Sequence, residues 1–159
     1  MAASLGLAAA APATSVPSTK AWFSLDSELD GGITAAVEID GTLYAAGWFT
    51  EAGGEPAEGV ATFDGSAWTP LPSGPGFEVE SLATDGINLY AGGIYYDFGP
   101  GESSPGGVAM WDGEDWTDLT GDLPEGSSIS SIVIAGEEVF AFGSALVDPQ
   151  DPAERICLA

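Results

Sequence analysis

Short apolar runs separated by turn residues recur along this chain at intervals of about 50 positions. The run at 43–47 (LYAAG) reappears at 89–93 (LYAGG) and at 139–143 (VFAFG). A second run at 63–68 (FDGSAW) reappears at 111–116 (WDGEDW). A repeat of this length built from short apolar segments and Gly-rich turns is typical of few protein arrays. The hydrophobic pattern therefore predicts an internally repeated, all-β protein.

Each repeat divides into strands joined by tight turns and long loops. Asp-Gly pairs mark the tight turns at 40–41, 64–65, 85–86 and 112–113, because Asp and Gly tolerate the positive φ angles that short hairpins require. Consecutive hairpins make an antiparallel meander. Both alternating faces of the runs at 43–46 and 139–142 are apolar or small, which suits a sheet covered on both sides.

The predicted strands and long loops follow from these signals. The strands are 33–39, 42–49, 59–63 and 67–71 in the first unit, 79–84, 88–95, 107–111 and 115–119 in the second, and 129–135, 138–145 and 155–158 in the third. The long loops are 26–32, 50–58, 72–78, 97–106, 120–128 and 145–154. Because strand direction reverses at each turn, we expect all the long loops at one end of the sheets.

These motifs resemble the kelch repeat. The Gly92-Gly93 doublet, the Trp111-Asp112 pair and Trp116 carry the resemblance in the second unit, and Asp64 and Trp68 carry it in the first. The units are also similar to bacterial and fungal cell-surface propeller repeats. The resemblance covers about residues 20–159 and implies a β-propeller of four-stranded antiparallel meander blades, with about three blades present as a partial ring.

The expected organisation is a leader followed by the partial propeller. Residues 1–17 resemble a signal peptide or form a disordered leader, so we expect an exported protein, extracellular or at the cell surface. The propeller region is 18–159, with blades at about 33–71, 79–119 and 129–159.

The two ends of the propeller region are predicted by alignment with the repeats. The segment 20–25 aligns with the fourth strand of the first unit, through Trp22 and Trp68, and is expected to close a ring. Ile156 aligns with Val60 and Val108. Since propellers usually have four to eight blades, either the remaining blades of a longer chain or a second copy would complete the ring.

The charge excludes two classes of partner. The chain has 25 Asp and Glu residues against 2 Lys and Arg residues, for a net charge of −23. Binding to nucleic acid or to anionic lipid requires clustered Lys and Arg, so neither partner is expected, and no apolar segment is long enough to insert into a membrane. The acidity is interpreted as a solubility or high-salt feature.

Candidate ligand-binding residues are the aromatic side chains that do not follow the repeat. Trp22, Trp68 and Trp116 recur once per unit and are expected to pack between sheets. Trp48, Tyr95, Tyr96 and Phe98 are irregular and border the long loops, where binding residues tend to lie. These four are the predicted binding residues for a carbohydrate or protein ligand on the long-loop face.

The absence of histidine from the sequence limits the catalytic mechanisms that the chain could use. The chain has no His, which excludes a Ser-His-Asp arrangement and any transfer of the copper site of the galactose-oxidase family. Acids are plentiful, but their spacing selects no catalytic pair, and the sequence predicts no metal site, cofactor or catalytic residue. The predicted function is therefore a non-catalytic binding or scaffold module. The alternative is a fragment of a propeller enzyme, carbohydrate-active or galactose-oxidase-like, whose catalytic residues lie elsewhere.

The charge imbalance predicts that salt stabilises the fold. Raising NaCl from low concentration to about 1 M shortens the screening length to about 3 Å and weakens repulsion among the carboxylates. We expect the melting temperature, measured by circular dichroism, to rise with salt. A melting temperature that stays flat over this range would show that self-repulsion does not limit stability.

Overall fold

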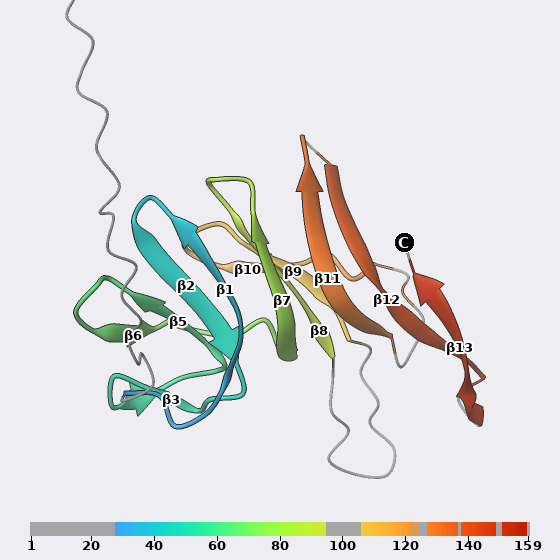
Figure 1. Cartoon of the computed structure of the whole chain (residues 1–159), viewed down its shortest axis with the longest axis horizontal. Helices are drawn as coiled ribbons and strands as arrows, with labels where there is room; N and C mark the ends of the chain where they lie inside the picture. Colours follow the sequence, from blue (N-terminus) through green and yellow to red (C-terminus); the bar gives the residue numbers. More distant parts are fainter. Residues whose placement is uncertain are drawn as a thin grey trace, which may run out of the picture.

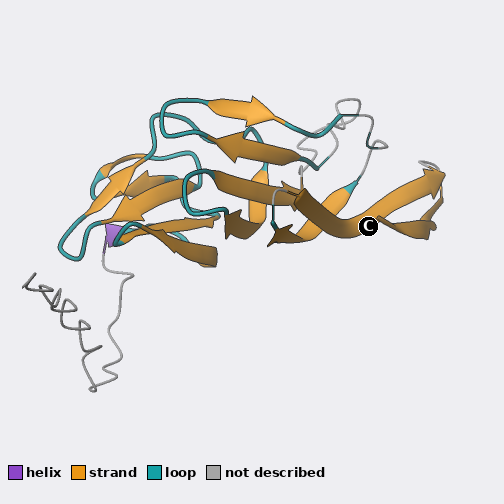
Figure 2. Cartoon of the chain, turned by 90° about the horizontal axis from the view of Figure 1, so that it is seen from above, coloured by secondary structure: helices purple, strands orange, loops and turns teal. Residues whose placement is uncertain are grey.

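The computed structural model describes residues 28–94, 106–121, 123, 127–136, 138–148 and 151–158. These residues form thirteen strands arranged in antiparallel sheets (Figure 1), and strands make up nearly all of their regular structure (Figure 2). The prediction of an all-β, antiparallel fold is confirmed. The predicted leader at 1–17 and the predicted strand at 20–25 lie outside the described residues.

Three successive ladders follow the chain. The first sheet contains β1 (Ile33–Ile39), β2 (Thr42–Gly47), β5 (Val60–Phe63) and β6 (Trp68–Pro70), in that order. The second sheet contains β7 (Glu78–Thr84), β8 (Leu89–Ile94), β9 (Val108–Trp111) and β10 (Trp116–Asp118). The third sheet contains β11 (Ser128–Ala135), β12 (Glu138–Asp148) and β13 (Asp151–Leu158). One residue pair, Ser128 with Ile94, joins β8 to β11, so these seven strands form one continuous sheet. Because that single pair is the whole connection, the two parts are described below as the second and third sheets.

The strands of the first two sheets match the predicted ones to within two residues at each end. Two of the predicted long loops differ from the structure. The loop at 50–58 contains a small hairpin of β3 (Glu51–Ala52) and β4 (Glu55–Pro56), whose strands are too short to leave a periodic pattern. The prediction of a loop at 145–154 is wrong for most of that range, because β12 and β13 continue to pair up to Asp148 and Asp151.

The register of β13 corrects one alignment. Val60 pairs with Ala46 and Val108 pairs with Gly92, whereas Ile156 pairs with Ala145, beyond Gly143. The predicted equivalence of Ile156 with Val60 and Val108 is therefore wrong. In a hairpin, the length of the turn sets which residues of the two strands pair. Because β12 and β13 pair up to Asp148 and Asp151, the residues of β13 pair with β12 at other positions than those at which β5 pairs with β2 and β9 pairs with β8.

A β-bulge lies at the same place in β1, β7 and β11, the first strands of the three sheets described above. The register shifts between Ile33 and Ala35 in β1, between Val79 and Ser81 in β7, and between Ile129 and Ser131 in β11. The repeated glycines Gly47, Gly93 and Gly143 pair with Ile33, Val79 and Ile129. A Cβ atom at these glycines would overlap the carbonyl oxygens of Gly32, Glu78 and Ser128, respectively. Close backbone approach therefore explains the repeated glycine.

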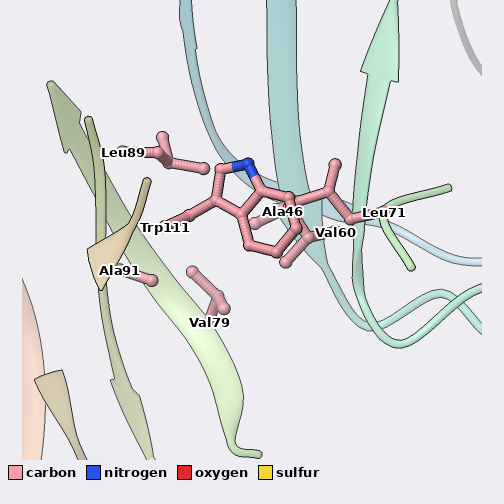
Figure 3. Close-up of a cluster of buried hydrophobic side chains, with 7 residues drawn as sticks. All are labelled: Ala46, Val60, Leu71, Val79, Leu89, Ala91 and Trp111. Atoms are coloured by element: carbon pink, nitrogen blue, oxygen red, sulfur yellow. The ribbon is translucent and has the colours of Figure 1, made fainter. Parts of the chain in front are cut away.

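The sheets pack face to face in chain order. We call the face of a sheet that turns toward the next sheet in sequence its forward face, and the opposite face its rear face. Ala46, Val60 and Leu71 from the first sheet pack against a second-sheet group on the rear face, as Figure 3 shows. That group consists of Val79, Leu89, Ala91 and Trp111. The Thr34 hydroxyl crosses the same junction and lies 2.5 Å from the carbonyl oxygen of Val79.

The second junction repeats the first. Tyr90 and Val108 on the forward face of the second sheet pack against Ile129 and Ile132 on the rear face of the third. A Cβ atom at Gly92 would lie 2.6 Å from Cγ2 of Ile129 and 3.0 Å from Cδ1 of Ile132, so glycine lets the third sheet approach. The first strands β1, β7 and β11 consequently lie side by side (Figure 1).

The repeated aromatic residues of the first two sheets form ring pairs within their own hairpins, a contact that the expected packing between sheets did not include. The rings of Phe63 and Trp68 are 5.2 Å apart, and those of Trp111 and Trp116 are 5.6 Å apart. Trp68 is buried, and the indole N–H of Trp116 donates to the carbonyl oxygen of Ser73 at 3.0 Å. Offset or tilted ring pairs of this kind stabilise a sheet beyond the area they bury. Trp22 lies outside the described residues.

The tight turns are held by aspartates, as the Asp-Gly pairs predicted. In both outer hairpins one carboxylate oxygen, of Asp64 or Asp112, accepts backbone N–H bonds from the residues two and three positions on. These bonds hold the pKa of both carboxyls below the ordinary range, chiefly through the N–H groups of Ala67 and Asp115.

Asp85 holds the turn between β7 and β8 with more bonds. It accepts from the N–H groups of Asn88 (2.7 Å) and Ile87 (2.9 Å), and also from the Asn88 amide and the Tyr90 hydroxyl. The backbone bond from Asn88 is the largest cause of a pKa lowered to about 2. A carboxylate with these partners favours one turn geometry in its ionised form.

Replacing Gly93 by Ala should strongly destabilise the protein. The new Cβ atom would overlap the Glu78 carbonyl oxygen in the sheet interior, and we expect a loss of about 3 kcal/mol in the free energy of unfolding. Gly54→Ala is the reference variant, since Gly54 has a φ of 81° and no atom within 4 Å of its Cβ position. Its expected cost is about 1 kcal/mol, from backbone strain alone. Urea unfolding measures both, and equal losses would contradict the close-approach argument.

Replacing Asp85 by Asn should destabilise the protein at neutral pH but not near pH 2. The folded-state pKa of about 2 lies below the ordinary value of 3.8. The charge of Asp85 therefore contributes stability that is complete above about pH 4 and is lost as the pH falls toward about 2. Because Asp85 is exposed, we expect a screened loss of about 1 kcal/mol at neutral pH.

Urea unfolding of Asp85→Asn at neutral pH and near pH 2 checks the pH dependence of Asp85. Asp40→Asn, in the exposed turn of the first sheet, is the control and should change little at either pH. A loss for Asp85→Asn that is the same at both pH values would refute the role of the ionised carboxylate.

Candidate functional site

A groove of about 390 Å³ lies where β2 ends and β7 begins. Its walls come from the loop after β2, from the residues before β5 and from the start of β7. The lining residues are Gly47, Trp48, Phe49, Thr50, Ala57, Glu58, Gly59, Phe77 and Glu78. We call it the Trp48 groove. It exists because the first junction brings the entry of β7 beside the exit of β2.

Trp48 lies against the backbone of Gly32 while most of its surface stays exposed. Its side chain is 66% exposed. A Cβ atom at Gly32 would lie 2.6 Å from the indole Nε1 and 2.8 Å from Cε2, so the indole rests against the backbone of Gly32. The Trp48 N–H also donates to the Gly32 carbonyl at 3.1 Å. Gly32 thus supports one part of a flat aromatic surface, most of which faces solvent.

Phe77 is supported in the same manner on the other side of the groove. Its ring lies against Gly93 and Gly107, whose added Cβ atoms would come within 2.8 Å and 2.9 Å of ring carbons. The side chain is half-buried and packs on the core of the first junction. The groove is therefore bordered by two aromatic residues, each placed by neighbouring glycines.

Hydrogen bonds fix the polar wall of the groove. Asp30 accepts from the N–H of Thr50 at 2.7 Å, from the Thr50 hydroxyl at 2.6 Å and from the N–H of Glu51 at 2.8 Å. The hydroxyl bond is the main cause of a lowered pKa of Asp30. Glu58 reaches across to the N–H of Gly74 at 2.8 Å through one oxygen.

The position of Trp48 is not part of the repeat. It follows Gly47, and the residues that follow Gly93 and Gly143 are Ile94 and Ser144. The packing needs of the repeat therefore do not explain an aromatic side chain there. A flat, exposed ring beside carboxylates that accept hydrogen bonds can contact the apolar face of a ligand and orient its hydroxyl groups.

One of the four predicted binding residues lies among the described residues. Trp48 lies on the groove, at the end of the sheets that carries the long loops. Tyr95, Tyr96 and Phe98 lie outside the described residues. Phe77 and Glu78 were missed, because their approach to Trp48 depends on how the first and second sheets face each other.

A second, acidic depression of about 400 Å³ lies beside the β3–β4 hairpin, lined by Glu28, Leu29, Asp30, Glu51, Gly53 and Gly54. Its Asp30 carboxylate is engaged by Thr50 and Glu51. Glu28 accepts from the N–H of Trp68 at 3.3 Å. Within the described ranges, no three His, Cys, Asp or Glu side chains converge as metal ligands. The carboxylates of Asp30 and Glu28 thus hold neighbouring segments of the chain together, and the depression is not proposed as a ligand site.

Comparisons with known proteins do not extend this description. Neither a protein-family model, nor a curated protein, nor a solved structure matches the chain. The part of the chain that the structure describes contains no helix long and apolar enough to cross a membrane.

Proposed function

We propose that this protein is a non-catalytic binding module of the β-propeller type, and that the Trp48 groove binds a carbohydrate. Its location is extracellular or at the cell surface, following the leader expected at 1–17. The observation that carries the proposal is the exposed indole of Trp48, which rests on Gly32 and borders a groove with acceptor carboxylates.

The packing of the sheets supports the propeller architecture. The first and second sheets are four-stranded antiparallel meanders, their first strands lie side by side with β11, and the bulge recurs at one position in all three sheets. Propeller blades have this strand order and pack face to face around an axis. The three sheets correspond to kelch-like blades in this proposal.

The chemistry of the groove favours a neutral sugar. The net charge of −23 opposes anionic ligands. Pyranose rings present an apolar face that packs on indole, and their hydroxyl groups donate to carboxylates such as Glu58 and Glu78. A protein ligand is the alternative occupant, and it would need to cover far more than this groove.

The alternative function is a fragment of a propeller enzyme. A glycosidase of the carboxylate-pair type needs one carboxyl with a raised pKa to act as general acid. Among the described residues, the carboxyls whose pKa is shifted are Asp30, Asp64, Asp85, Asp112 and Asp118, and hydrogen bonds from nearby backbone and side-chain groups lower the pKa of each. These groups hold turns and loops together, so binding is the function that the described residues favour.

Glycan binding tests the proposal directly. We expect the purified chain to bind neutral glycans on an array with or without calcium, and Trp48→Ala to weaken the affinity at least about tenfold by removing the aromatic surface. Trp48→Phe should keep part of the affinity. Isothermal titration with the best glycan measures all three proteins.

A control separates groove contacts from a general effect on stability. Ile87 is 79% exposed and lies in the β7–β8 turn, away from the groove lining, so Ile87→Ala should bind like the unaltered chain. The proposal fails if no glycan binds in either calcium condition, or if Trp48→Ala binds as tightly as the unaltered chain.

A further inference from the structure

The chain contains five Asp-Gly pairs, and all of them lie among the described residues. They are at 30–31, 40–41, 64–65, 85–86 and 112–113. At such a pair the backbone nitrogen of the glycine can attack the side-chain carboxyl of the aspartate, because glycine has no side chain to hinder the approach. Loss of water then closes a succinimide ring. The fold decides at which pair the two groups are free to react.

Hydrogen bonds hold four of the five carboxylates. Each of the four accepts two backbone N–H groups beyond the glycine, at 2.7–3.0 Å. The donors are Thr50 and Glu51 for Asp30, Ser66 and Ala67 for Asp64, Ile87 and Asn88 for Asp85, and Glu114 and Asp115 for Asp112.

These bonds protect the four aspartates in two ways. They turn the carboxylate toward donors other than the glycine nitrogen. Hydrogen bonds also lower the pKa of all four carboxyls, chiefly through the Thr50 hydroxyl for Asp30 and through a backbone N–H for the other three. Since the nitrogen attacks the neutral acid, a carboxyl that stays ionised reacts slowly.

Asp40 has no such protection. It is exposed, and its carboxylate accepts no hydrogen bond from any residue that the structure describes. Ile39 pairs with Thr42, so Asp40 and Gly41 form a two-residue hairpin turn, with φ angles of 50° and 83°. Positive φ at both central residues is the type I′ turn. Asp40 is also the one non-glycine residue with a positive φ in the described ranges, a conformation that a Cβ atom makes unfavourable.

The turn leaves room for the ring to close. Closure requires rotation about the Cα–C bond of Asp40, which turns the peptide plane between Asp40 and Gly41. A type II′ turn differs from type I′ by such a rotation, keeps the positive φ at its first central residue and also fits the twist of a hairpin. No atom lies within 4 Å of the Cβ position at Gly41. The pairing of β1 with β2 therefore does not oppose the rotation.

Glu38 contacts the atom that must lose a proton. Its Oε1 accepts from the N–H of Gly41 at 2.6 Å, within the range at which a carboxylate acts as a general base. The other four pairs lack this contact. The N–H of Gly86 donates to the Thr84 hydroxyl, and within the described part of the chain no other glycine of these pairs donates to a carboxylate.

We propose that Asp40-Gly41 is a site of spontaneous backbone modification, at which Asp40 rearranges to isoaspartate. The Gly41 nitrogen bonds to Cγ of Asp40, and Glu38 takes the N–H proton and returns it to the departing hydroxyl group, which leaves as water. Water then adds to the ring. Addition at Cγ restores aspartate, whereas addition at the main-chain carbonyl carbon leaves the chain joined through Cγ. One water is lost and one is gained, so the product has the same mass.

The modification is independent of carbohydrate binding. The turn follows the Ile39–Thr42 pair, at the opposite end of β1 and β2 from the Ile33–Gly47 pair. Gly47 lines the Trp48 groove, so the two sites lie at opposite ends of the first sheet. Isoaspartate adds one atom to the main chain of the turn and leaves the groove residues unchanged.

Peptide mapping of the complete folded chain tests the proposal. The chain is incubated at about pH 5, where ordinary carboxyls are still partly protonated, and electron-transfer fragmentation of its peptides distinguishes isoaspartate from aspartate. We expect isoaspartate at residue 40 to accumulate at least about tenfold faster than at each of the other four pairs, which must first break hydrogen bonds to the carboxylate. In concentrated urea the five rates should become similar. Equal rates in the folded chain, or no isoaspartate at residue 40 by the time it has formed in urea, would overturn the proposal.

Two matched variants test the part played by Glu38. Glu38→Gln keeps an acceptor for the Gly41 N–H but cannot take its proton, so the rate at residue 40 should fall at least about tenfold. Glu114→Gln makes the same change in the exposed turn at Asp112-Gly113 and should leave the rate at residue 40 unaltered. Circular dichroism confirms that both variants are folded. An unchanged rate in Glu38→Gln overturns the role of Glu38 as the base.

Discussion

The close approach of a backbone carbonyl oxygen to a glycine at each β-bulge is the constraint on which the rest of the structure depends. Gly47, Gly93 and Gly143 each stand opposite the residue before a bulge, where a Cβ atom would overlap a carbonyl oxygen of the paired strand. A bulge bends its strand and increases the local twist. Because the bulge is repeated in register, the three sheets share the same shape and can pack on one another in order.

Packing between sheets then decides where chemistry is available. The first junction brings Phe77 and Glu78 beside the exit of β2, and this produces the groove at which Trp48 is exposed. The proposed ligand site is thus a consequence of the way in which the first two sheets stack.

Much of the fold could be predicted from sequence because its signals are local. The bounds of β1 were predicted correctly, and Asp64 and Asp112 hold the turns that the Asp-Gly pairs indicated. The β3–β4 hairpin could not be predicted, since its two-residue strands carry no alternation. The register of β13 was also wrong, because spacing along the chain does not reveal that β12 and β13 pair up to their turn. Of the four predicted binding residues, Trp48 is the one that lies among the described residues.

The sequence by itself determined the strands, the tight turns and the antiparallel order, since each depends on neighbouring residues and on the conformational preferences of Gly and Asp. It also marked Trp48 as a residue outside the repeat. The tertiary structure alone decided which faces of the sheets are covered, and so why Ala46 is buried while its counterpart Phe142 is exposed. The physical reason is that burial depends on the sheet that lies opposite, and no property of a strand's own residues specifies that neighbour.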